Sequence, residues 1–230
     1  MAVVLWPKRR STPIAAIVTG GYHTCARTSG GGAKCWGNGH HGQLGDGANT
    51  GSNTPVDVSG LTSGVSAIAG GAYHTCWLTS GGGVKCSGFN GNGELGDGTT
   101  AWSNTPVDVS GLTSGVSKIA AGATAYHTCA VTTTGGIKCW GQGSCGQLGD
   151  GAGVDRLTPV DVVGLTRGVI ASTAGERHTC ALTFYGGVKC WGYNQYGQLG
   201  DDTTTTRNTP VYVSGLMGNI LFFPSVGKNP

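Results

Sequence analysis

Four copies of one sequence pattern dominate this chain and constrain what it can fold into. Each copy contains His-Thr-Cys, a second Cys ten residues later, and a Gly-Gln-Leu-Gly-Asp segment, in which Glu94 replaces Gln in the second copy. The first cysteines of successive copies lie 51, 53 and 51 residues apart. A period near 50 residues with several short strands per copy is typical of propellers and other stacked β arrays.

The composition agrees with an all-β array and excludes several other classes of protein. Glycine supplies 45 of 230 residues and only 11% are charged, which excludes helical bundles and coiled coils. The 38% of hydrophobic residues argues against disorder. A net charge of +3, with most basic residues scattered singly, gives no basic stripe, so we expect no nucleic-acid partner. No apolar run approaches the roughly 20 residues that span a bilayer, so we expect no membrane insertion.

The spacing within each copy predicts a disulfide-linked hairpin. If Cys25 and Cys35 are directly opposed, the hairpin loop is Ser29-Gly30-Gly31, and the equivalent loops also end in Gly. Gly suits the left-handed third position of such loops. In this register the paired cysteines form a non-hydrogen-bonded pair whose Cα separation of roughly 4.5–5.5 Å permits a disulfide. The predicted disulfides are Cys25–Cys35, Cys76–Cys86, Cys129–Cys139 and Cys180–Cys190.

Metal binding is the main alternative at these cysteines. His23, Cys25 and Cys35 would lie close together, but structural zinc needs a fourth ligand, and the copy offers none at regular spacing. Free thiols are a further alternative. Asp46, Asp97, Asp150 and Asp201 recur at one position, where side-chain turns are favoured over calcium loops because regularly spaced oxygen ligands are lacking. We therefore expect no metal and no cofactor.

The repeated stretches resemble the regulator of chromosome condensation repeat family. The matching segments are 178–183 (His-Thr-Cys-Ala-Leu-Thr), 186–192 (Gly-Gly-Val-Lys-Cys-Trp-Gly) and 197–201 (Gly-Gln-Leu-Gly-Asp), with equivalents in every copy. The resemblance implies four-stranded blades in a β-propeller, usually of seven blades. It also implies that this chain is similar to the exported bacterial members of the family, because those members carry the cysteine pair. Guanine-nucleotide exchange, known for the nuclear member of the family, is a weaker implication.

The domain boundaries follow from the repeats. We expect an N-terminal segment over residues 1–11, one domain of four propeller-type repeats over 12–216, and a C-terminal strand and tail over 217–230. Four copies are fewer than seven, so the array is either a small closed ring or part of a ring or array completed by other subunits. The C-terminal strand would complete the first blade or pair with another copy. Ser87 replaces a Trp found in the other copies, which predicts a less filled second blade.

Candidate binding residues lie in the variable loops between the constant segments. Aromatic, histidine and amide side chains on one rim suit recognition of a protein or glycan, although ordinary unconstrained loop residues are the alternative. The candidate face comprises His40, His41, Phe89, Asn90, Asn92, Trp102, Tyr193, Gln195 and Tyr196. Cys145, the unpaired ninth cysteine, is either a free thiol or an intermolecular bridge.

Catalysis has little support in the sequence. Ser, His and Asp recur as elements of the repeated frame, whereas a catalytic constellation is expected once. We therefore predict a non-catalytic, disulfide-stapled structural or self-assembling scaffold, with recognition of a protein or glycan as the alternative. Four disulfides indicate an oxidising compartment, so we expect the chain to be extracellular or at the cell surface.

Overall fold

Four blades of identical topology form the structure. A computed structural model describes residues 12–216, which form four antiparallel sheets of four strands each and confirm the predicted all-β propeller-type array. Blades 1 and 2 comprise β1 (Ile14–Thr19), β2 (His23–Thr28), β3 (Ala33–Gly37), β4 (Ser52–Asp57), β5 (Val65–Gly70), β6 (His74–Thr79), β7 (Val84–Gly88) and β8 (Ser103–Asp108). Blades 3 and 4 comprise β9 (Val116–Ala120), β10 (His127–Thr132), β11 (Ile137–Gly141), β12 (Arg156–Asp161), β13 (Val169–Ala174), β14 (His178–Thr183), β15 (Val188–Gly192) and β16 (Arg207–Tyr212).

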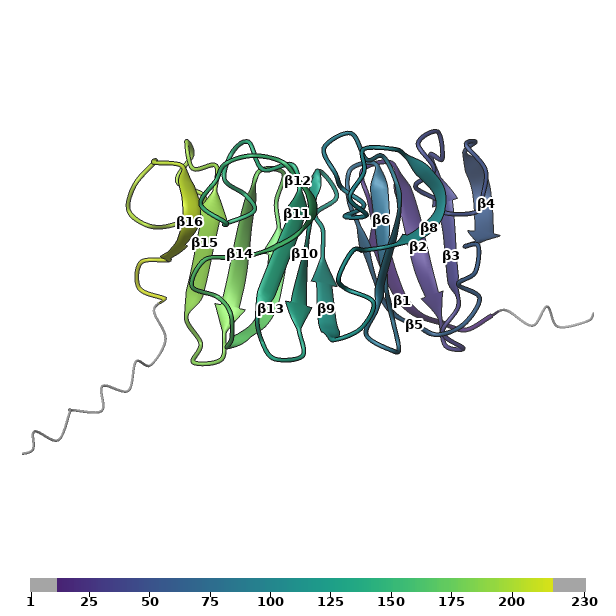
Figure 1. The fold of residues 1–230 in the computed structure, drawn as a ribbon. Helices are drawn as coiled ribbons and strands as arrows, with labels where there is room; N and C mark the ends of the chain where they lie inside the picture. The colour runs from purple at the N-terminus through teal and green to yellow at the C-terminus, as the bar shows by residue number, and fades with distance from the viewer. Residues whose placement is uncertain (1–11, 217–230) are drawn as a thin grey trace, which may run out of the picture.

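The blades stand side by side in an open row (Figure 1). The first strands of successive blades, β1, β5, β9 and β13, contact one another, so they line the inner side of the array. Blades 1 and 4 lie at opposite ends, and the described residues do not form the small closed ring that was one alternative (Figure 1). The predicted N-terminal segment 1–11 and C-terminal strand and tail 217–230 lie outside the described residues.

The hairpin register agrees with the prediction in every blade. Cys25 opposes Cys35, and the amide of Thr28 donates to the carbonyl of Gly32 at 2.8 Å, which closes the loop. Gly31 has φ +79°, a left-handed conformation that a side chain rarely adopts, and the equivalent glycines have φ of 79–82°. The repeated glycine therefore has a conformational reason.

All four predicted disulfides are present. Their Cα atoms lie 4.1 Å apart, somewhat closer than the expected range. Because these sulfurs bond to each other, the zinc and free-thiol alternatives are wrong for these cysteines. Within residues 12–216 there is also no group of three or more His, Cys, Asp or Glu arranged to hold a metal ion.

The hydrophobic core is divided among the three junctions between blades. At each junction the disulfide of one blade packs with its own Leu and Val side chains and with a Trp from the next blade. Those tryptophans are Trp77, Trp140 and Trp191, all fully buried. A Trp side chain buries a large apolar area, so one residue contributes a large share of the stabilisation at each junction.

The second blade is filled despite Ser87, so the expectation of a less filled blade is wrong. Trp77 stands where the equivalent residue is alanine in the other blades, and it reaches the same space from the neighbouring strand. A Cβ built on Gly45 would lie 2.8 Å from the Trp77 ring, as one on Gly96 would lie 2.8 Å from Trp140. Positions 77 on β6 and 87 on β7 lie on the same face of the sheet, so a Trp at either one can fill the space. Comparison of position 87 alone across the copies does not show this.

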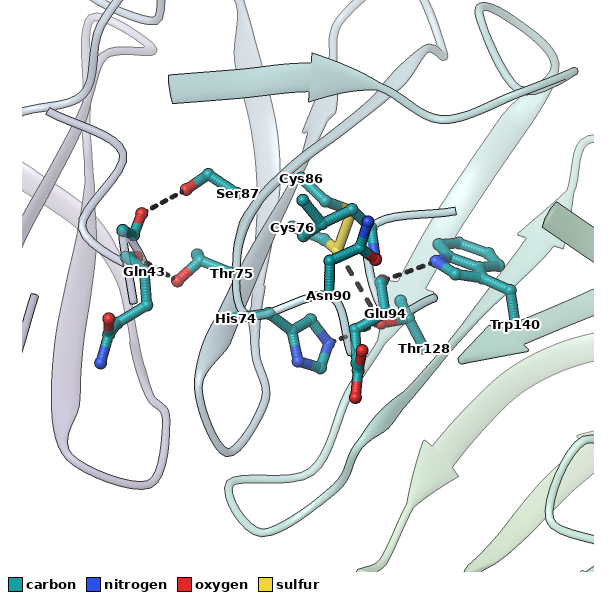
Figure 2. The surroundings of a disulfide bond; sticks show 12 residues. Gln43, His74, Thr75, Cys76, Cys86, Ser87, Asn90, Glu94, Thr128 and Trp140 are labelled. Carbon is teal, nitrogen blue, oxygen red and sulfur yellow. Dashed lines mark hydrogen bonds between the residues drawn. A yellow bond between two sulfur atoms is a disulfide. The ribbon is translucent and has the colours of Figure 1, made fainter. Parts of the chain in front are cut away.

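Histidine and threonine side chains link successive blades. The Nε2 atom of His74 in blade 2 lies 2.7 Å from Oγ1 of Thr128 in blade 3, as Figure 2 shows. His23 meets Thr75 at 2.7 Å and His127 meets Thr179 at 2.8 Å in the same way. Burial lowers the pKa of His23 to about 4 and that of His74 and His127 to about 3, so these links join neutral rings. These three histidines therefore have a structural role, because each joins its blade to the next.

The recurring aspartates form the predicted side-chain turns. The Oδ1 atom of Asp46 accepts a hydrogen bond from the amide two residues later at 3.0 Å, and the other three aspartates repeat the contact. These turns hold the long loops between the third and fourth strands of each blade.

Among residues 12–216 no helix is long and apolar enough to cross a membrane.

Candidate functional site

Two kinds of loop meet on one side of the array. In each blade the first-to-second and third-to-fourth strand connections lie at the same end, because successive strands are antiparallel. The long third-to-fourth connections run along the upper side in Figure 1. The residue before each His-Thr-Cys segment and the variable loops therefore share this side.

Six aromatic rings from three blades form a continuous aromatic patch on this side. Its members are Tyr22, His41, Tyr73, Phe89, Trp102 and Tyr126. Tyr73 lies at its centre, with ring centroids 5.7 Å from Tyr22, 5.0 Å from His41 and 5.9 Å from Tyr126. Phe89 and Trp102 extend the patch outward, 5.7 Å and 4.5 Å from His41. Offset and edge-to-face arrangements of this kind are favourable for aromatic rings.

The patch is both accessible and anchored. Tyr22 is 65% exposed and Trp102 is 52% exposed, while the other four rings are half-buried. Each tyrosine directly precedes one of the buried histidines that link the blades, so its backbone has a fixed position. Exposed aromatic groups on a rigid support provide binding surface at a small cost in conformational entropy.

The electrostatics keep the patch close to neutral. Burial, followed by the neighbouring His40, lowers the pKa of His41, so its ring is uncharged at neutral pH. Burial raises the pKa of Glu94 to about 7, although its carboxylate accepts hydrogen bonds from the Asn92 amide at 2.9 Å and from its Nδ2 at 2.6 Å. Burial also raises the pKa of Tyr126. The patch therefore offers mainly apolar and aromatic surface for contact.

Three of the predicted binding residues belong to the patch: His41, Phe89 and Trp102. His40 is exposed beside them and lines a pocket of about 360 Å³ with Trp102. Asn90 is a correction, because it is fully buried and holds the loop through bonds to the carbonyls of Thr99 and Ala101. Asn92 is half-buried and supports Glu94.

The predicted residues of blade 4 lie apart from the patch. Tyr193 and Tyr196 contact each other with centroids 6.1 Å apart, and Gln195 accepts a hydrogen bond from the Tyr193 hydroxyl at 2.5 Å. Tyr196 is 87% exposed, but no ring contact joins this pair to the six rings within the described residues. Cys145 is half-buried and forms no disulfide within residues 12–216. Whether it is a free thiol or an intermolecular bridge stays a prediction.

The three tyrosines are members of the patch that the sequence interpretation missed. Tyr22, Tyr73 and Tyr126 belong to the repeated frame, whereas attention to the variable loops favoured residues that differ between copies. The fourth copy has Arg177 at the position of these tyrosines. That difference between copies could have pointed to the tyrosines, because it marks the blade at which the row of aromatic residues ends.

The opposite side of the array carries a smaller aromatic pair. Phe184 and Tyr185 occupy the hairpin loop between β14 and β15, with exposed fractions of 71% and 69%. Their centroids lie 5.5 Å apart. This pair offers a matched control for experiments on the patch, because it has similar chemistry and lies at the other end of the strands.

Comparison with known proteins identifies the repeat. The regulator of chromosome condensation (RCC1) repeat matches residues 14–43, 65–94, 116–147 and 169–198 with one profile. A second profile of that description matches residues 35–78, 82–131, 135–182 and 185–226. Both profiles find four copies, in agreement with the four blades.

Curated relatives are identical to this chain at more than a third of the matched positions. The E3 ubiquitin-protein ligase HERC2 of Homo sapiens is 36% identical over 207 residues, which cover 88% of this chain and 4% of that protein. The ultraviolet-B receptor UVR8 of Arabidopsis thaliana is 36% identical over 191 residues, which cover 81% of this chain and 43% of the receptor. The chain thus spans less than half the length of these relatives.

Solved structures show the same fold. Prp20p from Saccharomyces cerevisiae superposes with a TM-score of 0.77 at 22% identity, covering 90% of this chain and 52% of Prp20p. Human WBSCR16 gives a TM-score of 0.75 at 22% identity, covering 86% and 51% of the two chains. Repeat profiles, curated relatives and fold agree, and the chain belongs to the regulator of chromosome condensation (RCC1) repeat family.

Proposed function

We propose that this chain is a recognition module that binds a partner protein through the aromatic patch. The observation that carries this proposal is the continuity of six aromatic rings contributed by three blades. Interfaces concentrate their binding energy in a few aromatic anchors that are held rigidly and surrounded by other contacts. Tyr73 satisfies this description, since it contacts three other rings.

The family comparison supports a protein as the partner. Prp20p has binding properties to Gsp1p and histones, and yeast RCC1 (Prp20) has also been crystallised bound to Kap60. Gsp1p, histones and Kap60 are partners of the yeast protein. For this chain they support only the class of ligand, and the glycan alternative stays a prediction that the same experiment addresses.

The test compares a patch variant with a matched surface variant. Immobilised wild-type chain, Tyr73→Ala and Phe184→Ala would be used to capture proteins from the source organism, and any captured protein would then be purified and titrated. Loss of a central aromatic anchor costs about 2 kcal/mol or more, which corresponds to roughly 30-fold weaker binding. We expect that loss for Tyr73→Ala and a change within about twofold for Phe184→Ala.

Two results would contradict the proposal. Equal affinities of a purified partner for wild type and Tyr73→Ala would remove the patch from the interface. Capture that disappears after enzymatic removal of glycans from the partner would replace a protein surface with a glycan as the ligand. Circular dichroism of each variant would verify that the blades remain folded.

Self-association is a second candidate, favoured by the way blades join. Three internal junctions use the same His–Thr contact, and Thr24 and His178 hold the corresponding positions on blades 1 and 4 at the ends of the row. We propose that such end faces bind a blade of another copy. Native mass measurement over a wide concentration range tests this idea, and a constant monomer mass would refute it.

We also propose an extracellular or cell-surface location. The four disulfides support it, because such bonds persist in oxidising compartments. Fractionation of cells that express the natural gene, with detection of the chain in the cytosol alone, would contradict this location. The absence of catalytic activity and the weaker alternative of guanine-nucleotide exchange stay predictions.

A further inference from the structure

Comparison of the four long loops reveals an ion pair that only two blades possess. In each blade the recurring aspartate is followed six residues later by the first residue of the outermost strand. That residue is arginine in blades 3 and 4 and serine in blades 1 and 2. Arg156 donates from Nε to Oδ2 of Asp150 at 2.7 Å, and Arg207 donates to Asp201 at 2.9 Å. The arginines cover their aspartates, whose side chains are only 7% and 6% exposed.

Blade 2 keeps the acceptor in the same arrangement but lacks the cation. The Oδ1 atom of Asp97 accepts bonds from the Asn90 side chain at 3.2 Å and the Thr99 amide at 2.9 Å. Blade 4 repeats these contacts at Asp201, so the two carboxylates are held alike. The Oδ2 atom of Asp97 is equivalent to the oxygen that Arg207 binds, and among the described residues it accepts only from the Thr99 hydroxyl, at 3.1 Å. No cationic side chain within residues 12–216 pairs with Asp97.

Ser103 does not replace the missing arginine. Its hydroxyl donates to the carbonyl of Thr105 at 2.6 Å, away from the carboxylate. Ser103 and the exposed Trp102 also line the pocket of about 360 Å³, together with His40, Asn49 and Asn104. That volume lies at the lower end of the range of small-ligand sites. Ser103, which stands where blades 3 and 4 hold an arginine, therefore lies on the wall of an open space that Trp102 also lines.

We propose that the Asp97–Ser103 position beside Trp102 binds the guanidinium group of an arginine from a partner protein. The chain itself supplies the precedent, since its own arginines bind the equivalent carboxylates in two blades. A guanidinium group donates in a planar fork that matches a carboxylate and stacks on a tryptophan face, whereas an ammonium group does neither as well. Trp102 also belongs to the aromatic patch, so the inference rests on the proposed function and adds a polar anchor at its rim.

The test uses a defined peptide and needs no natural partner. The blocked tripeptide Gly-Arg-Gly would be titrated into ¹⁵N-labelled chain while the indole N–H resonance of Trp102 is followed, after assignment with Trp102→Phe. We expect a saturable shift with the arginine peptide. We expect at least fivefold weaker binding of the lysine peptide and none of the citrulline peptide, which keeps the shape of arginine but lacks its charge.

Variants separate the site from general attraction of a cationic peptide. Asp97→Asn should weaken binding at least tenfold, and Ser103→Arg should abolish it because the chain then fills the position itself. Ser52→Arg makes the same change in blade 1, where Gly51 replaces the tryptophan, and should leave the Trp102 titration within twofold of wild type.

The outcomes are decisive for this site and separate from the test of partner binding. An unchanged titration in Asp97→Asn or Ser103→Arg, or equal binding of the citrulline or lysine peptide, would overturn the guanidinium assignment. Peptide binding together with failure of Tyr73→Ala to weaken a partner would refute the proposed function but leave the arginine site intact.

Discussion

The exchange of tryptophan between two strands at the first junction gives a quantitative prediction. Trp77 is fully buried among side chains of blade 1, so Trp77→Ala should leave a large cavity there. Substitutions of this kind typically cost 3–5 kcal/mol, about 4 kcal/mol in the middle of the range. Ser87→Trp alone should also destabilise the chain, by about 1–3 kcal/mol, because two indoles would compete for one space.

The double variant Trp77→Ala/Ser87→Trp should recover most of this stability. It recreates the alanine and tryptophan arrangement of blades 3 and 4, where Trp140 and Trp191 occupy the corresponding space. The indoles of those residues donate to the carbonyls of Glu94 and Gln147 at 2.9 Å (Figure 2 shows the first). The Trp77 indole N–H, by contrast, is buried without a partner in the described part of the chain. An indole at position 87 would gain such a bond but remove the one that the Ser87 hydroxyl donates to the Gly42 carbonyl at 2.9 Å, so the recovery comes from packing.

Urea unfolding of the four proteins tests this reasoning. With a urea dependence of about 1–3 kcal/mol per molar, the Trp77→Ala midpoint should fall by about 1 M or more, and the double variant should return to within about 0.5 M of wild type. The two single costs would then far exceed the cost of the double variant, as expected for residues that share one space. A double variant no more stable than Trp77→Ala would refute the claim that both positions serve the same packing site.

Two further predictions concern the buried carboxyl and the disulfides. Glu94→Gln, which restores the residue of the other copies, should stabilise the chain by up to about 3 kcal/mol at pH 8, because the wild-type pKa is raised from 4.5 to about 7. The folded state then binds the proton more tightly than the unfolded state, so wild-type stability from this group falls as pH rises from 4.5 through 7. The advantage of the variant should therefore vanish below pH 4.5 in thermal unfolding measured across pH, and a pH-independent difference would contradict the assignment. Cys76→Ala/Cys86→Ala should lower the unfolding free energy by about 3 kcal/mol, and reductant should then shift its melting temperature less than that of wild type, which loses one more bond.

The repeated frame could be predicted from the sequence because its determinants are local. Hairpin register, turn glycine and disulfide depend on residues within about ten positions of one another, and four copies test each expectation independently. The exchange of Ser87 and Trp77 was not predicted, because it depends on which face two paired strands share. A single position compared across copies cannot show that a neighbouring strand compensates.

The binding surface was only partly predictable because neighbouring blades assemble it. His41 and Trp102 come from loops of different blades, yet their rings lie 4.5 Å apart. Tyr73 contacts His41 from the β5–β6 connection. In the sequence this tyrosine appears only as one residue of the repeated pattern. Asn90 looked like a surface residue because it lies in a variable loop, whereas its amide satisfies buried backbone carbonyls. Exposure depends on packing across blades, which loop variability does not reveal.

The most direct test of the proposed recognition role is a hydrogen-exchange footprint of the chain bound to its purified partner. We predict protection of the connections that carry the aromatic patch, residues 20–22, 38–51, 71–73, 89–102 and 121–126. We predict unchanged exchange in the hairpin loops on the opposite side, including 184–186. Protection confined to those hairpin loops, with none around Tyr73, would contradict the claim that the aromatic patch is the binding surface.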